Sequence, residues 1–414
     1  MQLGWIDFSK EDRDKVHEVM NLLQEPGSVD ELGIGPVRDG FANYFFPGTS
    51  TVQTKAKYFL LVPYLLQEAI DGKFGNDINR ILARIEDEEY ECAKIMYYAA
   101  INAGQPVEGI IGNTNLPGKF VLRKPSNIYW SGIKTFGIVC SEQDLSIQNV
   151  VASGLYLRNN VVNLNIGNRN DKAEEGEKDD LTAGKEKRTV LIKLPTSHTD
   201  DWRKNLRIDL TYDEAVFLRC MIKANARKNG QDSLLVYMLK NNLPKKEYPD
   251  FEALYEDIKD DLKAGAHNEL EHMMKLACDF NKLVLAARTR YNLQLSGGNN
   301  ERAKELWQDM LGAGMSNVAY VDIDDVVDSL KLNQPRLKNF LKELQLHLLA
   351  EDYVKADTCI KDWERKKKRE RAKLSKSDKY SDDIWIGGEK LDYRYFDALT
   401  ILKDIYKGEA SGNV

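Results

Sequence analysis

The sequence predicts a mainly α-helical protein with a smaller α+β portion in the middle of the chain. Apolar residues recur at helical spacing early in the chain and again over its second half. Between these parts, Gly, Pro and β-branched residues separate short apolar units, as they do between short strands. No internal repeat can be aligned, which argues against a solenoid or propeller. We therefore expect three regions, residues 1–103, 104–209 and 210–414.

The N-terminal region, residues 1–103, is predicted to be helical throughout. Pro26-Gly27 and Pro47-Gly48 interrupt the helical spacing, and Thr49, Ser50 and Thr51 offer N-caps for the helix that follows. The expected helices cover about residues 9–25, 37–46, 52–69, 76–84 and 87–103.

The middle region, residues 104–209, is predicted to be winged-helix-like and rich in β-structure. A helix over residues 125–136, with Pro125 in its first turn, lies between short apolar units. The apolar runs between Val150 and Leu194 are β-like. Residues 169–187 interrupt these runs and contain almost no apolar side chain, so we expect a mobile loop inserted between two strands.

The C-terminal region, residues 210–414, returns to helical spacing. Thr211 and Glu214 form a capping box before its first helix. The acidic residues 322–325 precede an apolar helix, where N-cap residues usually stand, and Gly297-Gly298 marks a break. These features predict a helical C-terminal domain.

The composition is that of an acidic protein of the cytoplasm. Its formal net charge of -6 means that any contact with nucleic acid has to come from local basic patches. The five cysteines are scattered and show no C-x-x-C spacing, which argues against a disulfide framework and fits a reducing cytosol. We find no signal peptide and no apolar stretch of about 18–20 residues, so we expect no membrane association.

A cationic and aromatic strip lies between Gly109 and Ser141, a stretch without Asp or Glu. Basic side chains neutralise phosphates and aromatic rings stack on bases, so the strip is a candidate nucleic-acid surface. Its candidate residues are Lys119, Arg123, Lys124, Tyr129, Trp130 and Lys134. Alternatively, Tyr129, Ile133 and Phe136 are core positions on one helix face, and the lysines are merely solvated.

A second candidate surface is a basic run near the C-terminus, which continues to Lys376. Its residues are Arg365, Lys366, Lys367, Lys368, Arg369, Arg371 and Lys373. Like charges at this density repel one another, and phosphates offset that repulsion while they release their counterions. Alternatively, the run is a solvated helix extension that Asp382 and Asp383 screen.

A third candidate is an anion-binding site at the start of the helix that follows Gly48. Hydroxyl groups and backbone N–H groups at a helix N-terminus can bind an anion. The candidate residues are Thr49, Ser50, Thr51, Gln53, Lys55 and Lys57. Alternatively, this is a well-capped helix start with its lysines on the solvated face.

Signals for metal or cofactor chemistry are weak, and we predict neither. His267 and His272 are five residues apart, so on a helix they differ by about 140° and do not share a face. The Gly-rich phosphate-binding and nucleophile motifs are absent. Asp382 and Asp383, followed by Glu389 and Lys390, loosely resemble the spacing of a nuclease site, but no β-pattern surrounds them.

Five blocks of the sequence occur together in one known family: residues 3–9, 30–39, 46–59, 125–133 and 391–395. On these blocks the chain resembles an uncharacterised prokaryotic family, a domain of unknown function, and the Gly-Thr-Ser-Thr block at Gly48 is the most specific. Members of this family are usually encoded in antiviral defence islands, beside helicases and phospholipase-D-like nucleases. The resemblance implies work on or near nucleic acid. It implies no catalytic residue, because no activity is established for the family.

We therefore expect a non-enzymatic, nucleic-acid-associated subunit of a bacterial antiviral (anti-phage) defence system. It would bind nucleic acid, with DNA favoured over RNA, and dock on a helicase or nuclease partner. Two alternatives stay open: a metal-dependent nuclease component, and a protein–protein adaptor without nucleic-acid contact. A metal-dependent cleavage assay tests the first alternative, and a salt titration of nucleic-acid binding tests the second.

Overall fold

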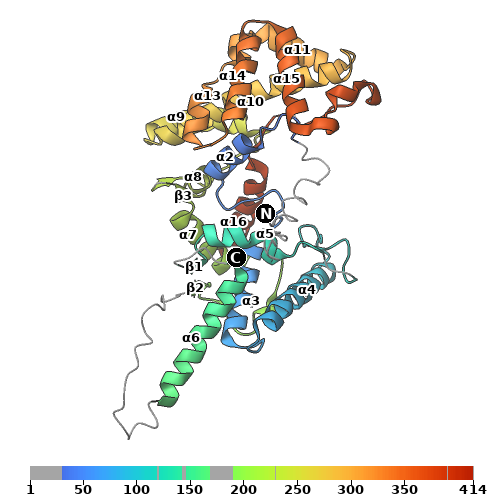
Figure 1. The fold of residues 1–414 in the computed structure, drawn as a ribbon. Coiled ribbons are helices and arrows are strands. Elements are labelled where there is room, and N and C mark those ends of the chain that lie inside the picture. Colours follow the sequence, from blue (N-terminus) through green and yellow to red (C-terminus); the bar gives the residue numbers. More distant parts are fainter. Residues whose placement is uncertain are drawn as a thin grey trace, which may run out of the picture. The chain divides into compact units, whose positions relative to one another are not determined.

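The computed structural model describes residues 30–118, 121–141, 146–167, 190–228, 230–388 and 390–413. Over these ranges the chain is mainly helical, as predicted (Figure 1). The strands described are very short and form two separate antiparallel pairs. These are β1 (Val139–Ser141) with β2 (Val190–Ile192), and β3 (Arg227–Lys228) with β4 (Gln231–Asp232). The expected helix near residues 9–25 and the expected mobile loop at 169–187 lie outside the described ranges.

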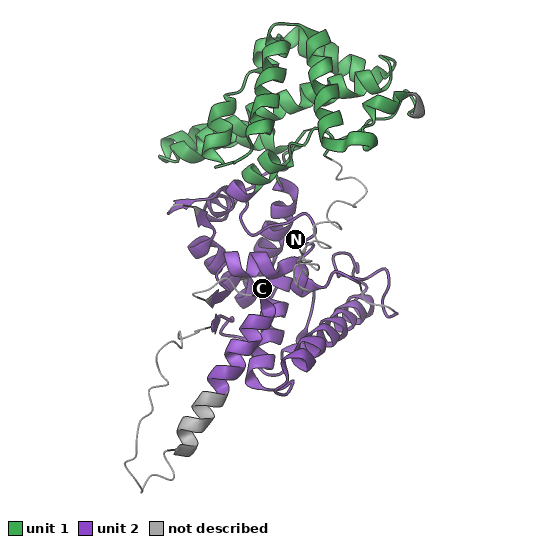
Figure 2. Ribbon diagram, in the orientation of Figure 1, with its two compact units in different colours: residues 1–42, 248–393 green, residues 43–247, 394–414 purple. Residues whose placement is uncertain are grey.

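The chain divides into two compact units, each built from segments that are distant in the sequence (Figure 2). Unit 1 comprises residues 1–42 and 248–393, and unit 2 comprises residues 43–247 and 394–414. The three consecutive regions expected from the sequence, residues 1–103, 104–209 and 210–414, do not coincide with these units.

Unit 1 is organised around α10 (Asn268–Leu295), which packs against α9, α11, α12 and α15. The other helices of unit 1 are α9 (Phe251–Ala264), α11 (Glu301–Ala313), α12 (Met315–Ala319), α13 (Ile323–Ser329), α14 (Pro335–Leu349) and α15 (Tyr353–Lys368), together with α2 (Gly35–Phe45) up to residue 42. Two 3-10 turns follow α15: η2 (Arg369–Arg371) and η3 (Leu374–Lys379). The predicted capping role of Asp322 is confirmed, because its side chain accepts from the N–H of Asp325 at 3.0 Å.

Side-chain amides hold the irregular segment that precedes residue 393. Asn281 pairs with both the N–H and the carbonyl of Leu391, at 2.7 and 3.2 Å. Asn292 does the same at Ile386, at 2.8 and 3.0 Å. These bonds satisfy backbone groups that no strand or helix pairs, and they fix the segment on α10.

Unit 2 is organised around the apolar helix α3 (Tyr58–Asp71), which packs against α4, α5 and α6. Its other helices are α4 (Ile78–Asn102), α5 (Pro125–Thr135), α6 (Ile147–Gly167), η1 (Trp202–Asn205), α7 (Tyr212–Asn225), α8 (Leu234–Asn241), α16 (Tyr395–Ala410) and η4 (Ser411–Asn413). The predicted capping box of Thr211 and Glu214 is confirmed at the start of α7. Gly132 allows α5 to pack closely, because a Cβ there would lie 2.4 Å from the carbonyl oxygen of Gly48.

Two local predictions were wrong in unit 2. The two helices expected over residues 76–103 are one continuous helix, α4, because nothing between them breaks the helical backbone. The β-like run after Val150 is helical, as α6. Val150 and Val151 are buried in it, and Gly154 lies so close to Ile70 that a Cβ would be 2.4 Å from that side chain. Packing on α3 thus overrides the β-propensity of the valines.

The winged-helix-like layout is not seen in the described part of the middle region. α5 is followed by β1, whose partner β2 begins about fifty residues later in the chain. No helix in the described ranges has the length and apolarity needed to span a membrane.

Candidate nucleic-acid interface

The basic run lies on the last turn of α15 and on the 3-10 turn η2 that follows. Asp352 caps the start of α15, and four consecutive cations, residues 365–368, occupy its last turn. Cations at a helix C-terminus interact favourably with the exposed carbonyl ends. Part of this positive charge therefore has a local structural reason.

A buried carboxylate shapes the turn after α15. Glu364 has no solvent exposure, and its two oxygens accept hydrogen bonds from the N–H groups of Lys373 (2.9 Å) and Leu374 (3.0 Å). The hydroxyl of Tyr291 donates to it at 2.7 Å. Burial and this bond raise the pKa of Tyr291. The chain is thereby drawn back onto α15, and the intervening residues 369–371 form the 3-10 turn η2.

Several cations of the run are engaged within unit 1. The ammonium group of Lys373 lies 2.6 Å from a carboxylate oxygen of buried Glu31, and that of Lys368 lies 3.8 Å from the other oxygen. Lys367 lies over the ring of Trp363, 5.1 Å from its centroid. These side chains therefore contribute to packing and are less available to a ligand.

The outward-facing cations of the run are Lys366, Arg369 and Arg371. All three side chains are exposed. None of them forms an ion pair or hydrogen bond with another described residue. Arg365 is exposed as well, but it pairs with Asp362 at 3.0 Å. We refer to Lys366, Arg369 and Arg371 as the basic tip.

A groove of about 920 Å³ runs between α14 and α15 beside the basic tip. Its charged lining comprises the cations Arg336, Lys355, Lys366 and Lys367 and the carboxylates Glu343 and Asp362. Phe340 and Trp363 also line it, stacked with their centroids 4.6 Å apart and their planes at 5°. Both rings are almost fully buried, so neither offers an open face to a base. The groove therefore suits an extended polyanion better than inserted bases.

The strip around α5 differs from its prediction. Tyr129 has no exposed surface, and its hydroxyl accepts from the N–H groups of Thr54 (2.7 Å) and Lys55 (3.0 Å). Burial raises its pKa to about 12. Its ring packs against Tyr58 and Phe59. Tyr129 therefore cannot stack on a base in this structure, and the alternative interpretation, a core position, describes it.

The other described side chains of the strip already interact with neighbouring groups of the protein. Lys124 forms an ion pair with Glu86. Arg123, Trp130 and Lys134 are half-buried and interact with neighbouring groups. Lys119 lies outside the described residues. The strip is thus less open to a ligand than the basic tip.

The expected anion site at residues 49–57 is internally satisfied. α3 begins at Tyr58, so Thr49, Ser50 and Thr51 form turns ahead of the helix and do not cap it. The Thr49 hydroxyl donates to the carbonyl of Phe46 at 2.7 Å, and the Gln53 side chain bonds to Ser50 and Gly48. These bonds use side-chain and backbone groups of Thr49, Ser50 and Gln53 that an anion would need, whereas Thr51 is exposed.

The two lysines of that segment are engaged by carboxylates. Lys57 lies 2.6 and 2.7 Å from the two oxygens of Glu214, and both side chains are almost fully buried. Lys55 pairs with Asp404 at 3.0 Å. The charge of Lys57 is therefore already neutralised by a buried carboxylate inside unit 2.

A buried polar network beside α3 was not predicted from the sequence. Glu68 accepts two hydrogen bonds of 2.6 Å from Arg203, which also contacts Glu88 at 3.0 Å. Burial alone would raise the pKa of Glu68, but the bonds to Arg203 and Lys73 lower it. Arg203 lies over a hundred residues from both Glu68 and Glu88 in the sequence, so no local spacing could have revealed its pairing with them. We interpret the network as structural, since its charges are paired.

The buried carboxyl of Glu89 makes the stability of unit 2 depend on pH. Burial raises the pKa of Glu89 from 4.5 to about 7, although it accepts bonds from the N–H and hydroxyl of Ser126. Between these two pH values the folded protein binds more protons than the unfolded chain. Stability is therefore expected to fall as the pH rises from 4.5 to 7, by up to about 3 kcal/mol.

Urea unfolding at several pH values measures this effect, with Glu89→Gln as the comparison. The variant should lose the pH dependence of this window and be more stable than the parent at pH 8. If the free energy of unfolding changed with pH equally in both proteins, Glu89 would not be the group responsible.

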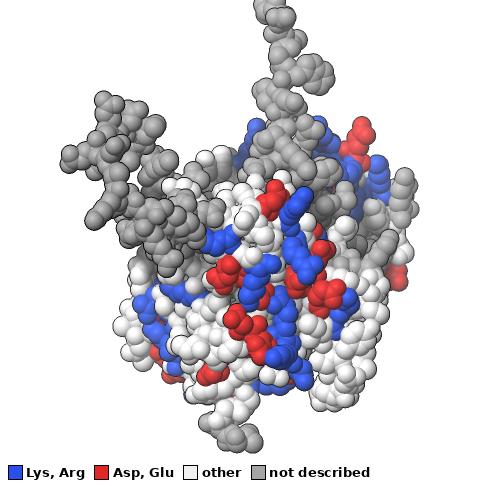
Figure 3. Space-filling view, turned by 90° about the horizontal axis from the view of Figure 1, so that it is seen from below, with Lys and Arg blue, Asp and Glu red and all other residues white. Residues whose placement is uncertain are grey.

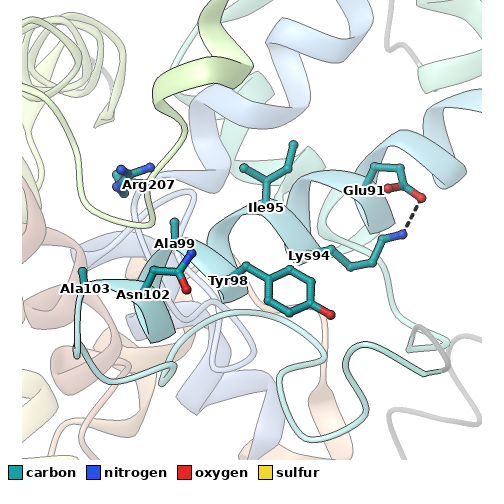
Figure 4. A pocket seen from close by; sticks show the side chains of 8 residues that line it. All are labelled: Glu91, Lys94, Ile95, Tyr98, Ala99, Asn102, Ala103 and Arg207. Atoms are coloured by element: carbon teal, nitrogen blue, oxygen red, sulfur yellow. Dashed lines mark ion pairs between the residues drawn. The ribbon is translucent and has the colours of Figure 1, made fainter.

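Another groove, of about 610 Å³, lies along α4 and is shown in Figure 4. Glu91, Lys94, Tyr98 and Asn102 line it from α4, and Arg207 comes from the segment after η1. Lys94 is engaged by Glu91 at 2.7 Å and by the ring of Tyr90. With one helix supplying nearly the whole lining, few polar groups converge, and the groove is a weaker candidate than the basic tip.

The histidines considered as metal ligands do not form a metal site in the described part of the structure. A ring nitrogen of His272 lies 2.8 Å from a carboxylate oxygen of Asp325. Among the residues that the structure describes, no three His, Cys, Asp or Glu side chains gather as a metal site would require.

Comparisons with known proteins add one finding. No curated protein and no solved structure is similar to the chain. Residues 1–150 match the model of a "Family of unknown function (DUF6361)". That stretch includes α3, α4 and α5 but not the basic tip. The N-terminal part of the chain is therefore similar to a protein family whose function is unknown.

Proposed function

We propose that this protein is a non-enzymatic nucleic-acid-binding subunit of a bacterial antiviral defence system, acting in the cytoplasm and docking on a helicase or nuclease. Its phosphate contacts would come from the basic tip. The observation that carries the proposal is the separation of the basic run into two sets. Lys367, Lys368 and Lys373 are engaged within unit 1, whereas Lys366, Arg369 and Arg371 are exposed without a charged partner among the described residues.

The charge pattern elsewhere supports a local contact. The protein as a whole is acidic, and on the face shown in Figure 3 basic and acidic side chains are interspersed. A polyanion would meet mixed charge there. At the basic tip it would meet three exposed cations within six residues of the chain, with the exposed Glu370 among them, and the mutual repulsion of the cations would fall on binding.

The lining of the α14–α15 groove favours recognition of the nucleic-acid backbone over recognition of bases. Its stacked rings are almost fully buried, and its lining carries more cations than carboxylates: Arg336, Lys355, Lys366 and Lys367 against Glu343 and Asp362. Phosphate contacts of this kind bind all sequences alike. We propose DNA as the preferred ligand, with RNA as the comparison in the test.

The test is a binding titration with a duplex DNA of mixed sequence, followed by fluorescence anisotropy. The variant Lys366→Glu/Arg369→Glu/Arg371→Glu is expected to bind at least about tenfold more weakly, because each lost contact is charge-assisted. Folding should be kept, since the three side chains are exposed.

The matched control is Arg80→Glu/Lys245→Glu/Lys403→Glu. These three cations are exposed on unit 2 and change the net charge by the same amount. The control should bind much more like the parent than the tip variant does. Equal weakening in both variants would point to net charge alone, and unchanged binding in both would favour the adaptor alternative.

A further inference from the structure

Arg369 has a backbone conformation that L-residues rarely adopt. Its φ is 53° and its ψ is -120°. Asn242 and Arg394 also have positive φ, but their ψ values of 48° and 23° fall in or near the ordinary left-handed region. At Arg369 the combination is one that glycine tolerates and a side chain with a Cβ makes costly.

The backbone at this position has a clear structural purpose. Arg369 follows the last residue of α15, where glycine is the commonest choice. Its conformation turns the chain so that the N–H of Ala372 reaches the Arg369 carbonyl at 3.1 Å. The chain can then return Lys373 and Leu374 to Glu364. Glycine would make this turn without strain.

The side chain of Arg369, unlike its backbone, does not stabilise the turn. It is exposed, and it makes no hydrogen bond or ion pair with the residues that the structure describes. The backbone conformation of Arg369 therefore lowers the stability of the fold, and no described contact of the guanidinium group offsets this loss. A ligand would offset it, because a guanidinium at the apex of a fixed turn is pre-positioned to bind an oxyanion.

We propose that Arg369 is a phosphate-binding residue of the basic tip, kept in a strained turn at a cost in stability. This inference rests on the proposed function and names the residue that contributes most to it. Lys366 and Arg371 flank it as weaker contacts. Lys366 is a flexible point charge, whereas Arg369 and Arg371 can each present two parallel N–H groups to one phosphate, and only Arg369 of these two stands in the turn with positive φ.

The variant Arg369→Gly separates the two effects. It should raise the melting temperature by about 2–4 °C, because it relieves the strain. It should also weaken duplex DNA binding by about tenfold. The control is Lys245→Gly, which removes an exposed cation of unit 2. The control should leave the affinity within about twofold of the parent.

The outcomes distinguish this inference from the proposed function. If Arg369→Gly binds like the parent while Lys366→Glu/Arg371→Glu binds weakly, the special role of Arg369 is overturned and the proposed function stands. If neither variant changes binding, the proposed function itself fails. A lower melting temperature for Arg369→Gly would overturn the claim of strain.

Discussion

Replacing Lys57 with methionine is expected to lower the free energy of unfolding by about 3–5 kcal/mol. Lys57 is 3% exposed and Glu214 is 6% exposed, and the ammonium group bonds to both carboxylate oxygens. Removing the cation leaves a buried carboxylate that still accepts hydrogen bonds from the Tyr64 hydroxyl and the Thr211 N–H but has lost its counter-charge. Chemical unfolding followed by circular dichroism measures the loss.

The double variant Lys57→Met/Glu214→Gln is the control for this prediction. It removes the uncompensated negative charge of Glu214 and keeps the shape of that side chain. The double variant should therefore recover part of the lost stability. A loss below about 1 kcal/mol in Lys57→Met would mean that the pair is open to water and not buried.

Replacing Tyr129 with alanine is expected to cost about 3–5 kcal/mol, as for other large aromatic residues in a core. Its ring is fully buried between Tyr58 and Phe59, and its hydroxyl serves two backbone N–H groups. The milder variant Tyr129→Phe keeps the ring but leaves those N–H groups without their acceptor, at a cost of about 1–3 kcal/mol.

Thermal and urea unfolding of the two variants test this ranking. The stacking interpretation of the strip makes the opposite prediction. It would be supported if Tyr129→Ala kept the stability of the parent and lost affinity for single-stranded DNA.

Local signals account for the parts of the fold that were predicted correctly. Thr211 with Glu214, and Asp322 with Asp325, are three residues apart and cap their helices within one turn. Such signals need no knowledge of the rest of the chain. In contrast, α6 is helical because of its packing on α3, and the division into two units depends on segments as distant as residues 42 and 248.

The candidate site was only partly predictable for the same reason. The density of positive charge at residues 365–373 is visible in the sequence. Which of these cations are engaged depends on Glu31, which lies more than 300 residues away, and on the fold of unit 1. The solvated interpretation of Lys57 failed likewise, since its partner Glu214 is distant in the sequence.

The salt dependence of duplex DNA binding tests the central claim most directly. The slope of log Kd against log salt concentration should be steep for the parent protein. For Lys366→Glu/Arg369→Glu/Arg371→Glu it should be smaller by about 2–3, because each phosphate contact contributes roughly 0.9. Equal slopes for the two proteins, or an affinity independent of salt, would contradict the proposal that the basic tip binds phosphates.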